Sequence, residues 1–406
     1  MIGFARLAAV LAPVVFAAPS SAADYEKAPS FLVARLLGAK AAGPNYTIIS
    51  PVLSDGTLRD YTIATRYGAL RVSGDEMLSM RLKELAALDA LEKVSRSSAF
   101  GDALVKAGLK PAEFVGNLVT APGATLNNTM EGVSHLLGGV VSGVRNLGKS
   151  QDRFLESVTG AAAARREIAY AYGVDPYTDY QPLSNELDSL SRASALGGLT
   201  VSAALIAVPG AAGTIVSGVS TAKTLSAQAR DNSAAQLMDL NRAKLAEDDV
   251  ASGVAEALLA NENFTPVDVA AFADAIGRLG PISNATIIAA RAAKADTRDV
   301  AFFIRRSVEM AAAYQQRART ITGFVDLGEG AYPSEATKAG GAVSVLAIDC
   351  LSWTKDTAAI LKAMTEALNG AGVGGAKTLI ISGTATPLAM KKLRGLGWDV
   401  KERAVK

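Results

Sequence analysis

The sequence predicts an α+β protein that is mostly helical, with an N-terminal β-hairpin, a long helical body and a small C-terminal βαβαβ parallel-sheet module. Three patterns along the chain indicate this fold. Two β-rich runs flank a turn signal within residues 24–72, helical periodicity fills residues 73–320, and short apolar runs alternate with helices in residues 321–406. A chain of 406 residues is expected to form two or three domains.

The composition predicts a globular chain and excludes several kinds of site. Hydrophobic residues make up 50% and charged residues 20%, and 41 Lys+Arg stand against 39 Asp+Glu, so no nucleic-acid partner is expected. Cys350 is the one cysteine and His135 the one histidine. An intrachain disulfide and His/Cys zinc sites are therefore excluded. Ser-His-Asp triads and Cys-His dyads are also excluded, unless His135 is the base. We expect no cofactor.

Residues 1–23 have the pattern of a secretory signal peptide. Arg6 gives the positive start, Leu7–Ala18 the apolar core, and Ser21-Ala22-Ala23 a small-x-small cleavage site before Asp24. An uncleaved anchor is the alternative, but the apolar run is shorter than the ~20 residues that span a bilayer. We expect an exported protein, periplasmic or secreted, and the low cysteine usage favours a bacterial one.

The segment 24–72 contains the predicted hairpin. Asn45–Leu53 and Leu58–Tyr67 are rich in β-branched and aromatic residues, and Asp55-Gly56 between them is typical of a tight turn. Ser73 then matches the N-cap of a helix that extends to about Val94.

Helical patterns fill the body that follows, and two of its stretches stand out. Residues 170–182 join two helices and hold four of the ten tyrosines, which favours a loop pinned to the helices, with ligand or sugar binding as the alternative. Residues 193–222 contain no charged side chain, and Pro209-Gly210 interrupts them. They predict two buried core helices; the alternative is a hydrophobic helical hairpin that enters a membrane, as in pore-forming colicin-type domains.

The C-terminal pattern predicts parallel strands joined by helices. Apolar strands are expected over 342–348, 378–381 and 398–404, with helices over 355–368 and 387–396. Ligands bind beyond the carboxyl ends of such strands. The candidate ligand-binding residues at this edge are Asp349, Ser382, Thr384 and Thr386.

These four residues favour a small anion, because Thr386 begins a helix whose amides point at the edge. The loop lacks the lysine of a phosphate-binding loop, and Pro387 removes one amide. For Asp349 a structural role is favoured, as the cap of the helix after its loop, and no catalytic residue is assigned. Cys350, with no histidine nearby in sequence, is interpreted as a core residue and not a nucleophile.

The arginines of residues 291–306 alternate with acidic residues. Arg291, Arg298, Arg305 and Arg306 are interleaved with carboxylates such as Asp299. This mixture predicts a solvated helix face and not a nucleic-acid-binding stripe.

Three stretches together resemble a family of exported bacterial proteins of unknown function. They are residues 173–178 (GVDPYT), residues 261–266 (NENFTP), and residues 381–387 (ISGTATP) followed by residues 393–400 (LRGLGWDV). In that family this order of elements runs over the last two thirds of the chain. The resemblance implies export and this architecture, and it implies no activity and no site residue.

These patterns predict a non-enzymatic periplasmic or cell-envelope protein that is structural or binds a protein partner. Two other functions stay open. The first is a small-anion binder or enzyme whose site lies in the C-terminal module, around Asp349 and Thr384. The second is a membrane-active protein that associates with the bilayer through residues 193–222.

Overall fold

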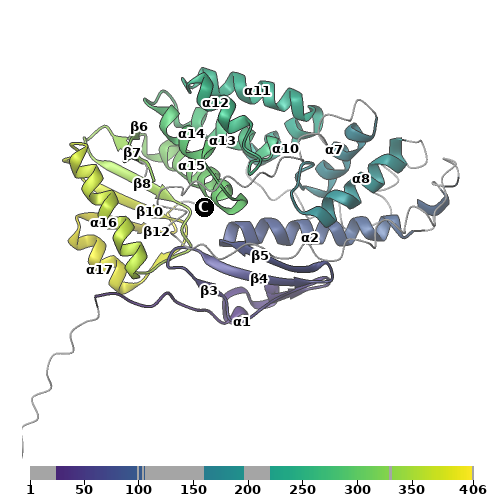
Figure 1. The fold of residues 1–406 in the computed structure, drawn as a ribbon, viewed down its shortest axis with the longest axis horizontal. Helices are drawn as coiled ribbons and strands as arrows, with labels where there is room; N and C mark the ends of the chain where they lie inside the picture. The colour runs from purple at the N-terminus through teal and green to yellow at the C-terminus, as the bar shows by residue number, and fades with distance from the viewer. Residues whose placement is uncertain are drawn as a thin grey trace, which may run out of the picture.

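The computed structural model describes residues 24–97, 100–102, 105, 160–195, 220–328 and 332–404. In Figure 1 an N-terminal sheet lies against helix α2, a group of helices lies above α2, and a second sheet stands at the opposite end from α7 and α8. The expected α+β class is confirmed. The predicted signal peptide, His135 and residues 196–219 of the uncharged stretch lie outside the described residues.

The N-terminal sheet confirms the predicted hairpin. Its strands are β1 (Ala42–Gly43), β2 (Tyr46–Ile48), β3 (Leu53–Ser54), β4 (Arg59–Thr65) and β5 (Gly68–Ser73), which follow α1 (Val33–Leu37) and the 3-10 turn η1 (Gly38–Ala41). Both β2 and β3 pair antiparallel with β4, and β5 pairs with its other side. The first predicted strand is therefore split in two, and Pro51 lies in the gap, where it has no N–H to donate.

Helix α2 (Asp75–Ser95) begins one residue beyond Gly74, which adopts a φ of 101°. The prediction that Ser73 caps this helix is wrong, because Ser73 is the last residue of β5 and its hydroxyl donates to Asp60 Oδ1 at 2.7 Å. The acceptor for the first helical amide comes from another part of the chain.

Helices make up the body, as expected. They are α7 (Gly160–Tyr172), α8 (Gln181–Ala195), α10 (Ser220–Asp231), α11 (Ala234–Glu247), α12 (Ser252–Leu259), α13 (Pro266–Leu279), α14 (Ala285–Ala293) and α15 (Arg298–Ala318). Thr265 caps α13 in a capping box. Across the described part of the chain, no helix combines the length and the apolar character that crossing a membrane requires.

The C-terminal sheet has five strands in the order β12-β10-β8-β7-β6. These are β6 (Ile321–Val325), β7 (Ser334–Thr337), β8 (Ala342–Leu346), β10 (Lys377–Ile381) and β12 (Trp398–Glu402), with helices α16 (Lys355–Gly370) and α17 (Pro387–Gly395). The three predicted strands β8, β10 and β12 are parallel. The antiparallel strands β6 and β7 extend the sheet beyond the prediction. Two short strands, β9 (Cys350–Leu351) and β11 (Thr384–Ala385), pair beyond the carboxyl ends.

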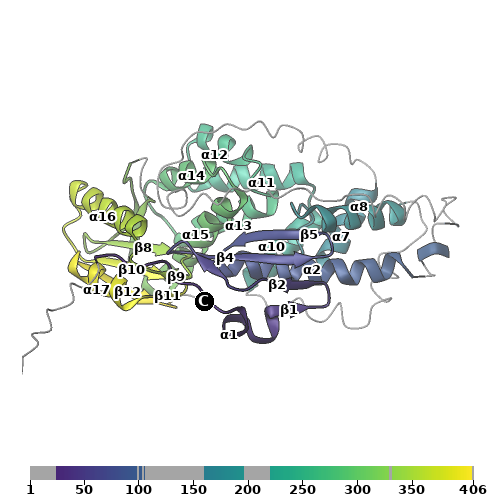
Figure 2. The same cartoon turned by 60° about the horizontal axis from the view of Figure 1, so that its bottom comes forward.

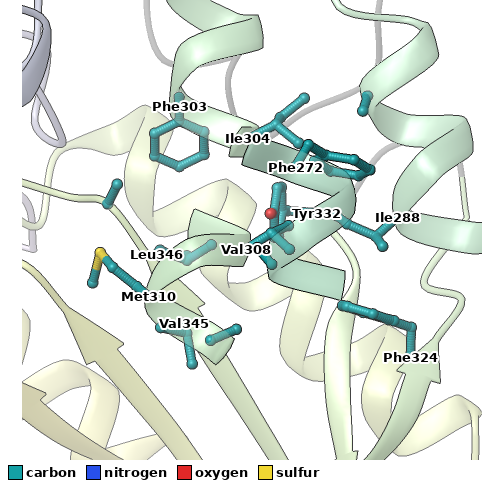
Figure 3. Packing of buried hydrophobic residues seen from close by; sticks show 14 of the residues in the cluster. Phe272, Ile288, Phe303, Ile304, Val308, Met310, Phe324, Tyr332, Val345 and Leu346 are labelled. Carbon is teal, nitrogen blue, oxygen red and sulfur yellow. The ribbon is translucent and has the colours of Figure 1, made fainter. Parts of the chain in front are cut away.

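Two large hydrophobic cores hold the described parts together. The larger one contains residues of α11–α15, of the C-terminal sheet, and of α16 and α17. Figure 3 shows Val308 of α15 near Leu346 of β8, and Ile304 beside Phe272 of α13. The connections from β8 to β10 and from β10 to β12 both move the same way along the sheet. Because such crossovers are right-handed, α16 and α17 lie on the same face, away from α15 (Figure 1). The second core lies between the N-terminal sheet, α2, α7 and α8. Leu58, next to the hairpin turn, is buried in the C-terminal core instead.

Candidate functional site

The four predicted site residues lie together at the carboxyl edge of the C-terminal sheet. Asp349 follows β8, and Ser382, Thr384 and Thr386 follow β10. Thr384 pairs with Cys350 in the β9–β11 ladder, so the two loops are bonded to each other. The two loops therefore form one bonded unit, and a ligand can bind there only through polar groups that these bonds leave free.

Asp349 is 4% exposed and acts as a cap, but not for the helix that follows it. Its Oδ2 accepts the amide of Asp75, the first residue of α2, at 3.0 Å and the amide of Arg59 at 3.1 Å. Helix α16 is capped by Thr354. Burial, with the negative charge of Asp75 next, raises the pKa of Asp349 well above its usual value, and the two backbone N–H groups oppose this rise.

Four amides that follow β10 are bonded to acceptors of the chain itself. Gly383 donates to Ile348 O at 2.8 Å, Thr384 to Asp349 O at 3.0 Å, and Thr386 to Leu351 O at 2.8 Å. The Ala385 amide donates to Glu402 Oε1 at 2.6 Å. These four amides lie beside the predicted anion site, which was expected at the first amides of the helix after Thr386 and at nearby hydroxyls, and each of the four already has an acceptor.

The Ser382 hydroxyl is used in the same way, since it donates to Ile348 O at 2.8 Å. A side chain at Gly383 is also excluded, because its Cβ would lie 1.8 Å from Asp349 O. Close backbone approach between the two loops therefore leaves no room for a ligand between them.

An anion does lie at the start of α17, and it belongs to the protein. The carboxylate of Glu26 accepts the hydroxyl hydrogen of Thr386 and the Trp353 amide, the latter at 2.5 Å. Glu26 N donates to Trp353 O at 3.0 Å. Asp24 is 3.4 Å from Lys392 Nζ, so the first described residues run across this edge (Figure 2). The anion at this position is therefore a carboxylate of the chain itself and not a separate ligand.

The hairpin turn covers the other half of the edge. Thr57 O accepts the amides of Asp349 and Cys350, both at 3.0 Å, and Gly56 O accepts that of Ser352 at 2.9 Å. The turn is itself held by Asp55, whose carboxylate accepts the Thr57 amide at 2.7 Å. The predicted ligand position is thus filled by two N-terminal segments.

Cys350 is a core residue, as interpreted. It is 5% exposed, and its Sγ lies 3.0 Å from the Ser54 hydroxyl. Burial raises the pKa of its thiol to about 11, so it is a thiol and not a thiolate at neutral pH.

A small hollow adjoins Asp349 on the side of α15. Its volume is about 10 Å³, and Gly74, Asp299 and Arg306 are among the residues that line it. A space of this size holds about one water molecule. It is too small for a substrate.

A second polar cluster connects the loop after α7 to α13, and sequence reasoning missed it. Thr265 Oγ1 lies 2.6 Å from Asp175 Oδ2 and 2.8 Å from Asp268 Oδ2. The hydroxyl has one hydrogen and can donate to only one of these carboxyls. Hydrogen bonds from this oxygen to both carboxyls therefore require a proton on one of them.

Asp175 is the partner that holds a proton more tightly. Asp268 forms ion pairs with Arg298 at 2.6 Å and Arg305 at 3.3 Å, and these arginines hold its pKa below the usual value. Burial and the charge of Asp268 raise the pKa of Asp175 to about 7. The pair of sequence motifs at 173–178 and 261–266 was the available signal, since each contributes one member of this hydrogen-bonded group.

The arginines of α15 are not a solvated face, which corrects that prediction. Arg298, Arg305 and Arg306 have side chains between 16% and 22% exposed and bond to carboxylates of other elements. Arg81 and Glu84 of α2, 2.7 Å apart, continue the network through Asp179. The network ties α2, the loop after α7, α13 and α15 together, so its charges serve packing.

Within the described ranges, no group of three His, Cys, Asp or Glu residues could hold a metal ion. Comparison with protein-family models, with curated proteins and with solved structures finds no match to this chain. The fold and the site define an α+β protein in which N-terminal residues close the edge of the C-terminal sheet.

Proposed function

We propose that this chain is an exported, non-enzymatic protein of the bacterial periplasm or cell envelope that binds a protein partner, with the C-terminal sheet as a structural module. The observation that supports this proposal is the occupation of the carboxyl edge by Thr57 and Glu26. An enzyme or anion binder that used this edge would need free donors there.

A ligand at this edge would have to displace several bonds at once. Glu26 occupies the Trp353 amide and the Thr386 hydroxyl, and the hairpin turn occupies the Asp349 amide. Because Leu58 of the same turn is buried in the C-terminal core, displacement would also expose apolar surface. Closure of the edge is thus coupled to the fold.

The N-terminal sheet offers a surface for a protein partner. Leu32, Ile49 and Leu53 are 56%, 47% and 46% exposed, and the bridge between Phe31 and Val52 joins their segments. Large apolar side chains grouped on a surface are typical of protein interaction sites.

Ligand screening tests the closed edge. We expect no nucleotide or sugar phosphate to raise the unfolding temperature through this edge, whereas a ligand at 100 times its Kd would add ~2.7 kcal/mol of stability. A thermal shift that Thr384→Ala abolishes, while the unliganded variant keeps the wild-type unfolding temperature, would contradict the proposal and favour a small-anion binder or enzyme.

Crosslinking in cells tests the partner surface. We expect a crosslinked complex that the double variant Ile49→Ser/Leu53→Ser loses. Leu240→Ser, which changes an apolar side chain of α11 that is 43% exposed, is the matched control and should keep the complex. Loss of the complex in both variants, or in neither, would contradict this surface.

Export is tested by N-terminal sequencing of protein recovered from the native compartment. The Arg6, Leu7–Ala18 and Ser21-Ala22-Ala23 pattern predicts a first residue at Asp24. A chain from the cytoplasm that begins at Met1 or Ile2 would contradict it.

A further inference from the structure

A hollow of about 110 Å³ lies between α7, α10, the start of α13 and the loop after α7. The residues used below are Arg166, Tyr170, Asp175, Ala229, Arg230 and Val267, all from its lining. Water occupies ~30 Å³ per molecule in the liquid, so the hollow has room for a few waters or one small organic ion.

The charge of the hollow comes from two arginines with different partners. Arg230 bonds to Asp231 at 2.7 Å, lies 3.9 Å from Glu167 and stacks on the ring of Tyr170 at 4.5 Å. Arg166 donates its Nε–H to Arg230 O at 3.0 Å. Within the described residues no carboxylate pairs with Arg166, so its two Nη groups keep their donors for another acceptor.

Below pH 7 the floor of the hollow carries little negative charge. Asp175 directs its oxygens to the Tyr177 amide, at 2.8 Å, and to the Thr265 hydroxyl, at 2.6 Å. Burial and the charge of Asp268 raise the pKa of Asp175 to about 7, so this carboxyl is mostly protonated below that pH. The excess charge of the hollow is therefore that of Arg166.

We propose that this hollow binds a small organic carboxylate, with its two oxygens on the Nη groups of Arg166 and its apolar part against Ala229 and Val267. A guanidinium pairs with a planar carboxylate through two parallel hydrogen bonds. The apolar lining favours a carboxylate with an alkyl group over a fully hydrated phosphate. The site is independent of the closed sheet edge.

Calorimetric titration of the full mature chain with isobutyrate, acetate and inorganic phosphate tests this site. We expect isobutyrate to bind more tightly than acetate, and phosphate more weakly than either. Arg166→Gln should weaken isobutyrate binding at least about tenfold, because charge-assisted hydrogen bonds are lost. Arg166→Lys, which keeps the charge and loses the two-pronged geometry, should give an intermediate loss.

Two controls separate this site from general charge effects and from the sheet edge. Arg192→Gln removes an exposed arginine of α8 and should bind isobutyrate as the wild type does. Thr384→Ala should also bind normally, so failure here is distinguishable from failure of the closed-edge proposal. Absence of isobutyrate binding to the wild type, tighter binding of phosphate, or unchanged binding by folded Arg166→Gln and Arg166→Lys would overturn the inference.

Discussion

The sheet edge around Asp349 and the loop region around Asp175 differ in how the space beside a buried carboxyl group is filled. Each buries a carboxyl group whose pKa is raised. At Asp349, distant segments of the chain fill the surrounding space and leave a hollow of about 10 Å³. At Asp175 the neighbouring hollow has about 110 Å³, and an arginine without a carboxylate partner in the described residues lines it. The sheet edge, where this fold class usually binds ligands, is closed. The binding site that we propose lies instead in the hollow beside Asp175, where Arg166 supplies the charge.

The largest expected effect is the pH dependence that Asp175 gives to stability. Its pKa is raised from 3.8 to about 7 by burial, so the folded chain holds this proton more tightly than the unfolded chain. The stabilisation from this group is therefore full below pH ~4 and falls as the pH rises to about 7, by up to ~1.4 kcal/mol per pH unit. Urea unfolding of the wild type and Asp175→Asn across this range should show the difference in slope.

The matched control for that experiment is Asp239→Asn, an aspartate of α11 whose side chain is 75% exposed. It should keep the wild-type slope, because an exposed carboxylate binds its proton similarly in both states. Equal slopes for the wild type and Asp175→Asn would show that Asp175 is ionised in the folded protein, and the two regions would then differ more than we infer.

At the closed edge, Asp349→Ala should lower the free energy of unfolding by ~2–4 kcal/mol. The substitution leaves the amides of Arg59 and Asp75 without their acceptor. Asp349→Asn keeps an oxygen in place and should change stability by less than ~1 kcal/mol, since a neutral side chain suits this buried position. Chemical denaturation measures both, and equal losses in the two variants would show that the charge of Asp349, and not its oxygen, is what α2 requires.

A smaller effect is expected from the occupant of the α17 N-terminus. Glu26→Ala should lower stability by ~1–2 kcal/mol, because the Trp353 amide and the Thr386 hydroxyl lose their common acceptor. Asp24→Ala should change it by less than ~0.5 kcal/mol, since the Asp24 side chain is 85% exposed. Thermal unfolding of both variants checks the contrast, and indistinguishable results would mean that Glu26 does not hold the edge closed.

Local signals in the sequence predicted much of this structure. Thr386 was expected to begin a helix and caps it, because a capping side chain reaches an amide three residues ahead. The three parallel strands followed from short apolar runs alternating with helices. Each of these features is determined within one element and its flanks.

The contents of the candidate site could not be predicted in the same way. Ser73 has a capping sequence, yet it bonds to Asp60, and the acceptor for α2 comes from Asp349, 274 positions from Asp75. The arginines of α15 alternate with acids as a solvated face does, yet Arg298 pairs with Asp268 of another helix. Pairing between distant residues leaves no periodic trace in a single sequence, so burial of these charges was not foreseeable.

The long separation between these partners also has a consequence for folding time. The hydrogen bond from Arg59 to Asp349 spans 290 positions, and that from Thr386 to Glu26 spans 360. At ~5–20 residues per second, synthesis separates the hairpin from Asp349 by about 15–60 s. During that interval the first amide of α2 lacks its acceptor and Leu58 lacks its core. The C-terminal module thus completes the N-terminal one, and a chain without it would leave Leu58 of the hairpin exposed.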